Sequence, residues 1–481
     1  MSTIRTLSCE VCPRGCFLEA EMEDGEVVHV SGNDCARGAK FAALKLNETM
    51  EAGTMPKTTT EWKAFLNTEA FLEAVTPLYI ASDAVAAQPA RYRSAIEAFE
   101  ERFGEGEAEL FSAPGRSEVG GNHTDHQHGK VLACSLNLDV IAVVRKTDDN
   151  IMTVKSEGYP EDTVDLSVLE PVPEEEGTSQ ALLRGVASAL KDAGYAIGGF
   201  QAYTTSNVLQ GSGMSSSAAF EVLLGTILSG LYNEDGISPV DVAKASQVAE
   251  NRFFGKPSGL LDQMACSVGN LVYIDFGDPS EPQVEQVDAD FGAFGHSLCI
   301  VDTKGSHADL TPDYAAVPDE MKQIAAFFGQ EVLNGIPEEK ILSHIPILRE
   351  RIGDRQVLRA IHWYEENKRV EREVEALTRG DFPAFLSEVK ASGDSSYKYL
   401  QNVYSARHLE AQAIPIALQL SDLVLQGEGA SRVHGGGFAG TIQAFVPNDL
   451  VEDYQWALES VFGEGACHIL YVRSVGGYHL K

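Results

Sequence analysis

The sequence predicts an α+β fold, and two observations lead to this prediction. From residue 110 to 310, short apolar segments with strand character are mixed with helical patterns rather than alternating strictly with them. From about 311 to 425 helical patterns dominate, and a strand, a helix and a strand follow at 441–447, 449–461 and 468–474. A hydrophobic content of 44%, with 22% charged residues, is that of an ordinary globular protein and supplies a large apolar core.

Local composition predicts the individual elements. Segments rich in β-branched and aromatic residues favour strands, and they are LFSA (110–113), LDVIAVV (138–144), FQAYTT (200–205), LVYIDF (271–276) and HSLCIVD (296–302). Apolar residues that recur every three to four positions favour helices, and these lie at 179–193, at 215–232, in the strongly charged segment 355–379 and on either side of Gln88-Pro89.

Four parts of the chain are predicted from these patterns. Residues 1–47 form a cysteine-rich module, 48–104 a linker with a helical lead-in, and 105–310 and 311–481 two larger domains. The first boundary rests on EAGTMPKTTT (51–60), because its Gly, Pro and Thr content is typical of a connector.

The charge of the chain excludes some partners. Lys plus Arg total 37 against 71 Asp plus Glu, a formal net charge of −34, so the surface repels nucleic-acid phosphates and anionic lipid headgroups. No apolar run approaches the roughly 20 residues that span a bilayer, and MSTIRTLSCEVCPRGC at the start lacks the features of a secretory signal. We therefore expect a cytoplasmic protein without nucleic-acid or membrane partners. The oligomeric state is left open, and a monomer is compatible with the sequence.

Four of the eight cysteines, Cys9, Cys12, Cys16 and Cys35, lie close together near the start, around the strand pattern E-V-V-H-V-S. Four thiolates at this spacing predict a [4Fe–4S] cluster or a tetrahedral Zn²⁺ site, and the spacing does not separate the two. The segment resembles a small CxxCPxGC domain of unknown function and the iron–sulfur segment of molybdopterin oxidoreductases. The alternative is a remnant of a gene fusion that binds no metal. No catalytic role is predicted for this module.

A glycine–serine segment before the helix at 215–232 is the strongest local signal. Glycines let the backbone turn tightly, and the unpaired N–H groups and dipole of a helix N-terminus attract anions such as a triphosphate. No lysine follows the glycines, so this is not a Walker A loop. The alternative is a serine-capped helix after a simple turn. The predicted phosphate-binding residues are Gly211, Ser212, Gly213, Met214, Ser215, Ser216, Ser217 and Ala218.

A polar, glycine-rich stretch, APGRSEVGGNHTDHQHG (113–129), follows the first strand of this region. Its polar side chains suit bidentate recognition of a polyhydroxylated ligand, and the histidines alternatively suggest metal ligation. Because so many polar residues would not be tolerated inside a strand or helix, we expect the stretch to lie outside regular structure. Its polar residues are Arg116, Asn122, His123, Asp125, His126 and His128.

Two further segments carry candidate site residues. ASQVAENRFFGKPSGLLDQMAC (245–266) places Glu250 on a helix and Asp262 after a Pro-Ser-Gly turn. GASRVHGGGFAGTIQAF (429–445) carries three consecutive glycines, Gly435, Gly436 and Gly437, before a strand, and such a run lets backbone approach a ligand closely.

In this order, the four segments resemble the GHMP kinase superfamily and, within it, the galactokinases. The galactokinase signature G-R-x-N-[LI]-I-G-E-H-T-D-Y is approximated from Gly115 to His126, and the motif P-x-G-x-G-[LM]-S-S-S-A from Asn207 to Ala218. The third glycine motif is similar to Gly435–Gly440, and Glu250 and Asp262 keep the E-x(11)-D spacing. The resemblance covers roughly residues 90 to 481. It implies two lobes, an ATP-binding one similar to ribosomal S5 domain 2 (105–310) and a ferredoxin-like one (311–481).

This resemblance also implies a reaction, the transfer of phosphate from MgATP to the anomeric hydroxyl of galactose. Asp262 and Arg116 are then the catalytic residues, and Ser217 and Glu250 the ligands of Mg²⁺. Asp262 as a carboxylate is a weak base, so it orients the hydroxyl and takes its proton late. The alternative for Arg116 and Asp262 is a purely structural ion pair. The implied sugar-binding residues are Asn122, His123, Asp125, Gly259 and Tyr314.

Departures from the family pattern leave alternatives open. The glutamate and tyrosine of the signature are Asn122 and His126 here, and the third motif has Val433-His434 and Ala439 in place of Met-Thr and Gly. Because the family glutamate accepts hydrogen bonds from the sugar, its loss motivates a C6-altered sugar such as a uronic acid as the alternative substrate. A non-catalytic regulator that binds sugar and ATP, and a redox module with a secondary kinase part, are the other hypotheses.

Overall fold

The structure, a computed structural model, describes residues 3–8, 17–23, 26–31, 57–208, 213–256, 258–305 and 310–481. Three antiparallel strands in the order β1-β2-β3 form a small sheet at the start of the chain: β1 (Thr3–Ser8), β2 (Phe17–Glu23) and β3 (Glu26–Ser31). β3 confirms the strand predicted at E-V-V-H-V-S. The four candidate metal ligands, Cys9, Cys12, Cys16 and Cys35, lie outside the described residues.

The helical lead-in consists of α2 (Thr59–Phe65), α3 (Glu69–Tyr79) and α4 (Ser82–Phe103). α4 passes through Pro89 without a break, so the two helical patterns predicted around this residue form one helix. Among the described residues, no single helix has the length and hydrophobicity to cross a membrane; α3 and α4, bent at 116° to each other, meet those criteria only as a pair.

An eight-stranded sheet forms the centre of the first lobe. Its strand order is β10-β9-β5-β8-β6-β7, and β4 pairs with both β5 and β15. All pairings are antiparallel except that of β6 with β8. The strands are β4 (Glu109–Gly120), β5 (Lys130–Lys146), β6 (Ile151–Ser156), β7 (Glu161–Asp165), β8 (Phe200–Ser206), β9 (Leu271–Asp275), β10 (Gln283–Val287) and β15 (Tyr478–Leu480).

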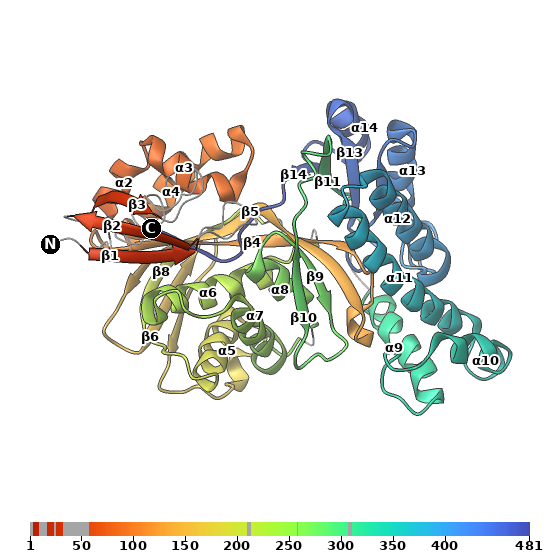
Figure 1. Cartoon of the computed structure of the whole chain (residues 1–481). Helices are drawn as coiled ribbons and strands as arrows, with labels where there is room; N and C mark the ends of the chain where they lie inside the picture. The colour runs from red at the N-terminus through yellow and green to blue at the C-terminus, as the bar shows by residue number, and fades with distance from the viewer. Residues whose placement is uncertain are drawn as a thin grey trace.

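Helices cover both faces of this sheet, with α2–α4 on one face and α5–α8 on the other (Figure 1). Strand β5 explains why both faces need a cover, since successive side chains of a strand point to opposite faces of the sheet and those of β5 are apolar on both. Val140, Ala142 and Val144 join the apolar cluster that contains α5 and α6 residues, whereas Ile141 and Val143 join the cluster beneath α2–α4. The second set of helices is α5 (Ser179–Asp192), α6 (Ser216–Asn233), α7 (Pro239–Val248) and α8 (Leu261–Val268).

The second lobe has a four-stranded antiparallel sheet in the order β12-β13-β11-β14. Its strands are β11 (His296–Asp302), β12 (Ala430–Val433), β13 (Thr441–Pro447) and β14 (Cys467–Leu470). Its helices are α9 (Thr311–Phe327), α10 (Glu338–Arg351), α11 (Asp354–Thr378), α12 (Phe382–Ser395), α13 (Ala413–Leu425) and α14 (Val451–Phe462). Short helices lie at Asp125–Gln127, Pro173–Glu175, Ala249–Phe254, Ser396–Leu400 and Asn448–Leu450.

The chain passes between the two sheets twice, first between β10 and β11 and again between β14 and β15. The strand predicted at 468–474 therefore ends early, at Leu470, because the following residues leave the small sheet. They run beside β5, where Arg473 donates its backbone N–H to Ser135, and β15 then pairs with β4.

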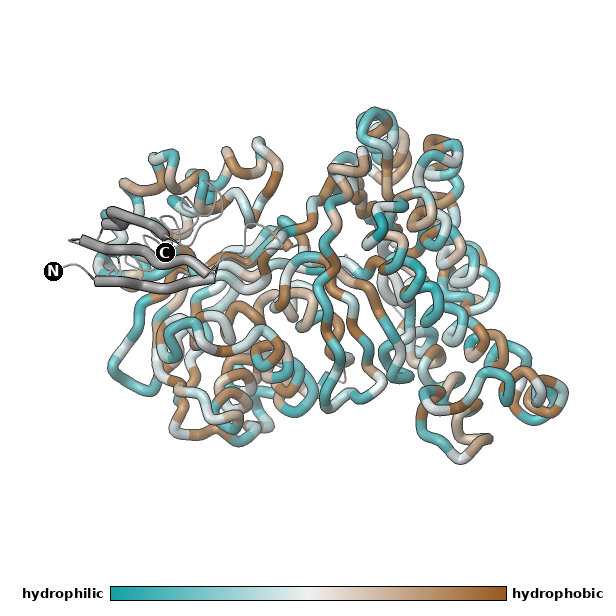
Figure 2. Tube along the Cα trace, viewed as in Figure 1, coloured by the Kyte–Doolittle hydropathy of each residue, from teal (hydrophilic) through white to brown (hydrophobic). Residues whose placement is uncertain are grey.

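Helix α11 is mostly hydrophilic along its length (Figure 2), yet much of its charge points inward. Arg359, His362, Glu366, Arg369 and Glu373 are all buried. The charged pattern at 355–379 therefore correctly predicts a helix, but these five side chains form a buried polar face rather than a solvated surface.

Candidate active site

The glycine–serine turn ends at the start of α6. Gly213 has φ of +73°, and Ser215, the residue before the helix, has φ of +56°. The side chain of Ser215 does not cap α6 but donates to Oδ2 of Asp262 over 2.6 Å. The first N–H groups of α6 therefore have no side-chain cap, as an anion-binding helix N-terminus requires. Gly211 and Ser212 lie outside the described residues.

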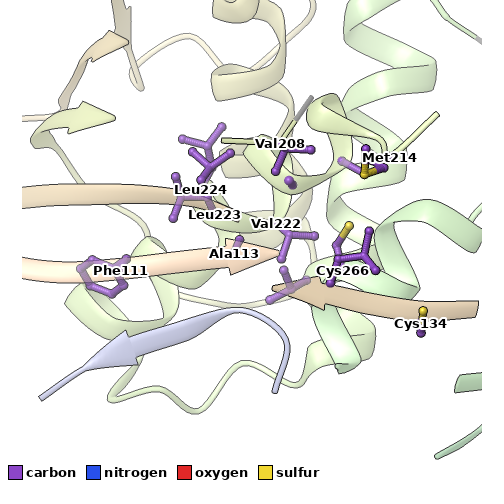
Figure 3. Close-up of a cluster of buried hydrophobic side chains, with 14 of the residues drawn as sticks. Phe111, Ala113, Cys134, Val208, Met214, Val222, Leu223, Leu224 and Cys266 are labelled. Carbon is purple, nitrogen blue, oxygen red and sulfur yellow. The ribbon is translucent and has the colours of Figure 1, made fainter. Parts of the chain in front are cut away.

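Apolar packing fixes the two ends of this turn. Val208 and Met214 lie in the same buried cluster as Val222 and Cys266 (Figure 3). The turn also docks on β4, where the backbone N–H of Arg116 donates to the Met214 carbonyl over 3.1 Å. Val208 and Met214, on either side of the undescribed residues 209–212, are thus both held at the sheet.

Gly115 makes this close approach possible. A Cβ at this position would lie 2.9 Å from Cγ1 of Val208 and 3.0 Å from the carbonyl oxygen of Met214. A larger side chain would push the turn away from β4, so glycine is required here for steric reasons.

Arg116 and Asp262 meet directly at the turn. Nε of Arg116 donates to Oδ1 of Asp262 over 2.6 Å, and Nη1 of Arg116 donates to the carbonyl of Gly213. The structure therefore brings together the turn, the guanidinium and the carboxylate, which lie far apart in the sequence.

One expectation about this region is wrong, since Arg116 does not lie outside regular structure. β4 continues to Gly120, and only the residues after it form a loop. Shifts in register between Pro114 and Arg116, and between Glu118 and Gly120, mark irregularities that let the strand turn its polar side chains toward buried partners.

The environment of Asp262 keeps it ionised. Burial alone would raise the pKa of this carboxyl, but the charge of Arg116 and the hydrogen bonds from Arg116 and Ser215 outweigh it and lower the pKa below its ordinary value. Asp262 is therefore a hydrogen-bond acceptor and a weak base at neutral pH.

Two hard oxygen ligands meet at the first turn of α6, Ser217 from that turn and Glu250 from the short helix Ala249–Phe254. The Ser217 hydroxyl is 3.5 Å from Oε1 of Glu250, and Gln263 donates to Oε2 of Glu250 over 2.8 Å. Lys256 contacts Oε1 of Glu250 at 2.6 Å, with its own side chain 58% exposed. A hydroxyl, a carboxylate and an uncapped helix N-terminus fit a hydrated Mg²⁺ and the phosphates it binds.

A second cluster contains the predicted sugar-binding residues. Asp125 faces Gly259 so closely that a Cβ on the glycine would lie 2.4 Å from Oδ2 of Asp125. Burial, followed by the charge of Glu118, raises the pKa of Asp125 to about 6, and Asp262 adds to the effect. This cluster therefore adjoins Asp262.

The three glycines of the third motif contact the predicted sugar-binding residues through their backbone carbonyl groups. Gly435 accepts from Nδ2 of Asn122 over 2.7 Å. The Gly436 carbonyl lies 3.0 Å from Nε2 of His123, and the Gly437 carbonyl accepts from the Tyr314 hydroxyl over 2.8 Å. The close approach predicted between these glycines and a ligand is thus made to the side chains of the predicted sugar-binding residues instead.

The side-chain amide of Asn122 has no free hydrogen-bonding group in this arrangement. Nδ2 donates to Glu118 and Gly435, while Oδ1 accepts from Asn402 at 2.9 Å and from Ser396 at 3.2 Å. The residue is 0% exposed. That Asn122 contacts the sugar stays a prediction, and these bonds give it a positioning role.

Sequence reasoning missed three residues of the site. Lys256 is a cation in the glycine–proline turn between Glu250 and Asp262, which is a usable signal, but Gln263 carries none. His434 was noted only as a departure from the family pattern. Its ring nitrogens lie 3.0 Å from the hydroxyls of Ser117 and Thr441, and burial, with Arg116 nearby, lowers its pKa well below the ordinary value.

Known proteins and family models resemble much of this chain. Residues 97–146 match the model of the galactokinase galactose-binding signature, and 181–270 match that of the GHMP kinases N-terminal domain. The galactokinase of Streptomyces coelicolor is 30% identical over 371 residues, which are 76% of this chain and 92% of that protein. The galactokinase of Glaesserella parasuis is 30% identical over 360 residues, 74% of this chain and 89% of that protein.

Solved structures show the same fold. Galactokinase from Lactococcus lactis, crystallised with galactose, is 24% identical, with a TM-score of 0.67 over 79% of this chain and 98% of that one. Mevalonate kinase from Methanococcus jannaschii is 13% identical, with a TM-score of 0.55 over 76% and 99%. The fold is that of the GHMP kinases, as the sequence predicted, and the chain belongs to the galactokinase family.

Proposed function

We propose that this chain transfers phosphate from MgATP to the anomeric hydroxyl of galactose, giving galactose 1-phosphate. One observation carries the proposal, namely the contact of Arg116 and Ser215 with Asp262 at the start of α6. Phosphoryl transfer needs groups that position the reactants and neutralise charge. In a chain of net charge −34, the guanidinium and the helix N-terminus supply that positive potential locally.

In this mechanism Asp262 accepts the hydrogen bond of the sugar hydroxyl and orients its oxygen toward the phosphate. Because its pKa is lowered, Asp262 is a weak base, and early removal of the proton from the sugar hydroxyl is unfavourable. The proton therefore moves to the carboxylate late in the transfer. Arg116 holds Asp262 in place and lies beside the transferring group. Ser217 and Glu250 are the residues that would hold Mg²⁺, which supplies charge neutralisation when bound.

The direct test is sugar-dependent release of ADP. A panel of monosaccharides with MgATP, followed by phosphorus NMR of the product, identifies both the sugar and the phosphorylated position. We expect rapid turnover of galactose and phosphate on the anomeric oxygen. Binding of galactose and ATP without turnover would favour the non-catalytic regulator, and phosphate on any other oxygen would contradict the proposed position.

Replacing Glu250 with alanine should raise the Mg²⁺ concentration for half-maximal activity by about 10-fold, because a carboxylate ligand is lost. The measurement is initial rate against free Mg²⁺ at fixed ATP. Glu170→Ala is the matched control. Glu170 pairs with Arg252, which lies in the same short helix as Glu250, but the side chain of Glu170 is 84% exposed. An unchanged Mg²⁺ dependence in Glu250→Ala would argue against ligation by this residue.

Sugar use should weaken in acid because of Asp125. Its carboxyl accepts hydrogen bonds most strongly when ionised, and its raised pKa of about 6 means that it becomes protonated as the pH falls through that value. We expect kcat/KM for the sugar to decline below about pH 6 and Asp125→Asn to remove this limb. The profile of kcat/KM for MgATP is the reference, and an identical decline in both profiles would contradict the assignment.

The other predictions stand as part of the same proposal. We propose a cytoplasmic enzyme, with divisions of the chain at residues 47, 104 and 310. The third division does not separate the two sheets, because β11 precedes it in the second lobe and β15 follows it in the first. A [4Fe–4S] cluster or Zn²⁺ at Cys9, Cys12, Cys16 and Cys35 is supported by their spacing alone. Metal analysis and the absorbance spectrum of anaerobically purified protein distinguish cluster, zinc and no metal.

A further inference from the structure

Two positions of the sugar signature have exchanged their residue types. The pattern G-R-x-N-[LI]-I-G-E-H-T-D-Y has an amide at its fourth position and a carboxylate at its eighth. This chain has Glu118 at the fourth and Asn122 at the eighth. In the structure the two side chains touch, because Nδ2 of Asn122 donates to Oε1 of Glu118 over 3.0 Å. The pair therefore keeps one amide and one carboxylate, with their positions reversed.

Position 122 is closed to a ligand. Both donors and the acceptor of the Asn122 amide are used by protein groups, and the residue is 0% exposed. Its backbone is held as well, since the carbonyl accepts from Nε2 of His362 over 2.9 Å. A sugar hydroxyl would have to break several of these buried hydrogen bonds to reach this side chain.

Glu118 is differently placed. Its Oε1 accepts from Asn122 and, over 2.9 Å, from the fully buried Arg432, while Oε2 accepts no hydrogen bond within the described part of the chain. That oxygen is not sealed from solvent, because the side chain is 12% exposed and Oε2 is not among the buried atoms without a partner. The carboxylate is also close enough to His123 and Asp125 to influence both electrostatically.

We propose that Glu118 supplies the carboxylate that recognises a hydroxyl group of the sugar, and that Asn122 is the positioning residue that orients it. The inference rests on the proposed function and identifies the residue on which its sugar specificity depends. Because the negative charge has moved from position 122 to position 118 and has not been lost, the substrate is a neutral hexose. The loss of charge that motivated a uronic acid does not occur.

The test compares Glu118→Gln with the wild type. A hydrogen bond to a charged group is replaced by one to a neutral amide, so KM for galactose should rise about 10- to 100-fold, with KM for MgATP within about twofold. Glu175→Gln is the matched control. Glu175 is also 9% exposed and also pairs with a buried arginine, Arg184 of α5, but it lies in the short helix Pro173–Glu175. It should leave both KM values unchanged.

Deoxygalactoses test contact rather than stability. The wild type should lose efficiency with the sugar that lacks the recognised hydroxyl, whereas Glu118→Gln should treat that sugar and galactose nearly alike. An equal penalty for each deoxygalactose in both proteins, or an unchanged KM for galactose in a folded Glu118→Gln, would overturn the proposal.

Restoring the family order gives a second, independent test. Asn122→Glu alone places two buried carboxylates in contact and should be strongly impaired. The double variant Glu118→Asn with Asn122→Glu should recover galactose KM to within about fivefold of the wild type, because the pair is complete again. If KM for galactose in the double variant is no lower than in its single variants, the proposed exchange of roles between Glu118 and Asn122 is wrong. This test holds even where Glu118→Gln fails to fold. A wild type that turns over no sugar would instead refute the proposed function itself.

Discussion

Asp262→Asn is expected to lose turnover by about 1,000-fold while binding both substrates almost normally. The amide keeps the shape of the side chain and one oxygen that can accept from Arg116, which lies 2.6 Å from the carboxylate. It removes the negative charge that orients the sugar hydroxyl and receives its proton. Because this function belongs to the transition state, kcat should fall and KM should not.

Steady-state kinetics and calorimetric ATP titration together check this result. Asp278→Asn is a suitable control, since Asp278 forms hydrogen bonds within its own exposed loop. Retention of more than a tenth of the turnover in Asp262→Asn would remove this carboxylate from the chemistry and leave the structural ion pair as its role.

The largest effect on stability is expected from Asp139→Ala. Asp139 is fully buried on β5, and Oδ1 pairs with Arg91 of α4 at 2.5 Å while Oδ2 pairs with Arg473 at 3.3 Å. Tyr79 of α3 donates to Oδ2 over 2.8 Å. Removal of the carboxylate leaves the buried guanidinium of Arg473 and the half-buried one of Arg91 without a counter-charge, which costs about 3–5 kcal/mol of unfolding free energy.

Urea unfolding measures this loss as a lower midpoint. Asp394→Ala is the contrasting control, because its pair with Lys398 is exposed on α12 and should change the free energy of unfolding by less than about 0.5 kcal/mol. Similar midpoints for Asp139→Ala and the wild type would mean that this network does not hold the lead-in helices to the sheet.

The sequence predicted the regular elements well where the local signal was strong. HSLCIVD gives β11 with both boundaries, and the segment 179–193 gives α5 to within one residue. Local sequence patterns failed where contacts with residues far away in the sequence determine the structure. β4 extends through Arg116 because Asp262, 146 positions away, neutralises that side chain. The charges of α11 face inward because partners from other segments bind them, as Asn122 and Ser392 do for Glu366.

For the site, sequence reasoning found the residues that fall in recognisable motifs, and the structure brings Gly213, Arg116 and Asp262 together. It did not find Gln263, whose importance depends on contacts with Glu250 and Glu221 from other helices. The exchange of Glu118 and Asn122 was visible in the signature, but that the two side chains touch is a property of the fold alone.

Two covalent tethers join the lobes, one between Val287 and His296 and the other between Leu470 and Tyr478. Since β15 pairs with β4, the sheet of the first lobe is completed by a strand that follows the whole second lobe in the sequence. The first lobe therefore cannot finish folding before the second lobe has been synthesised.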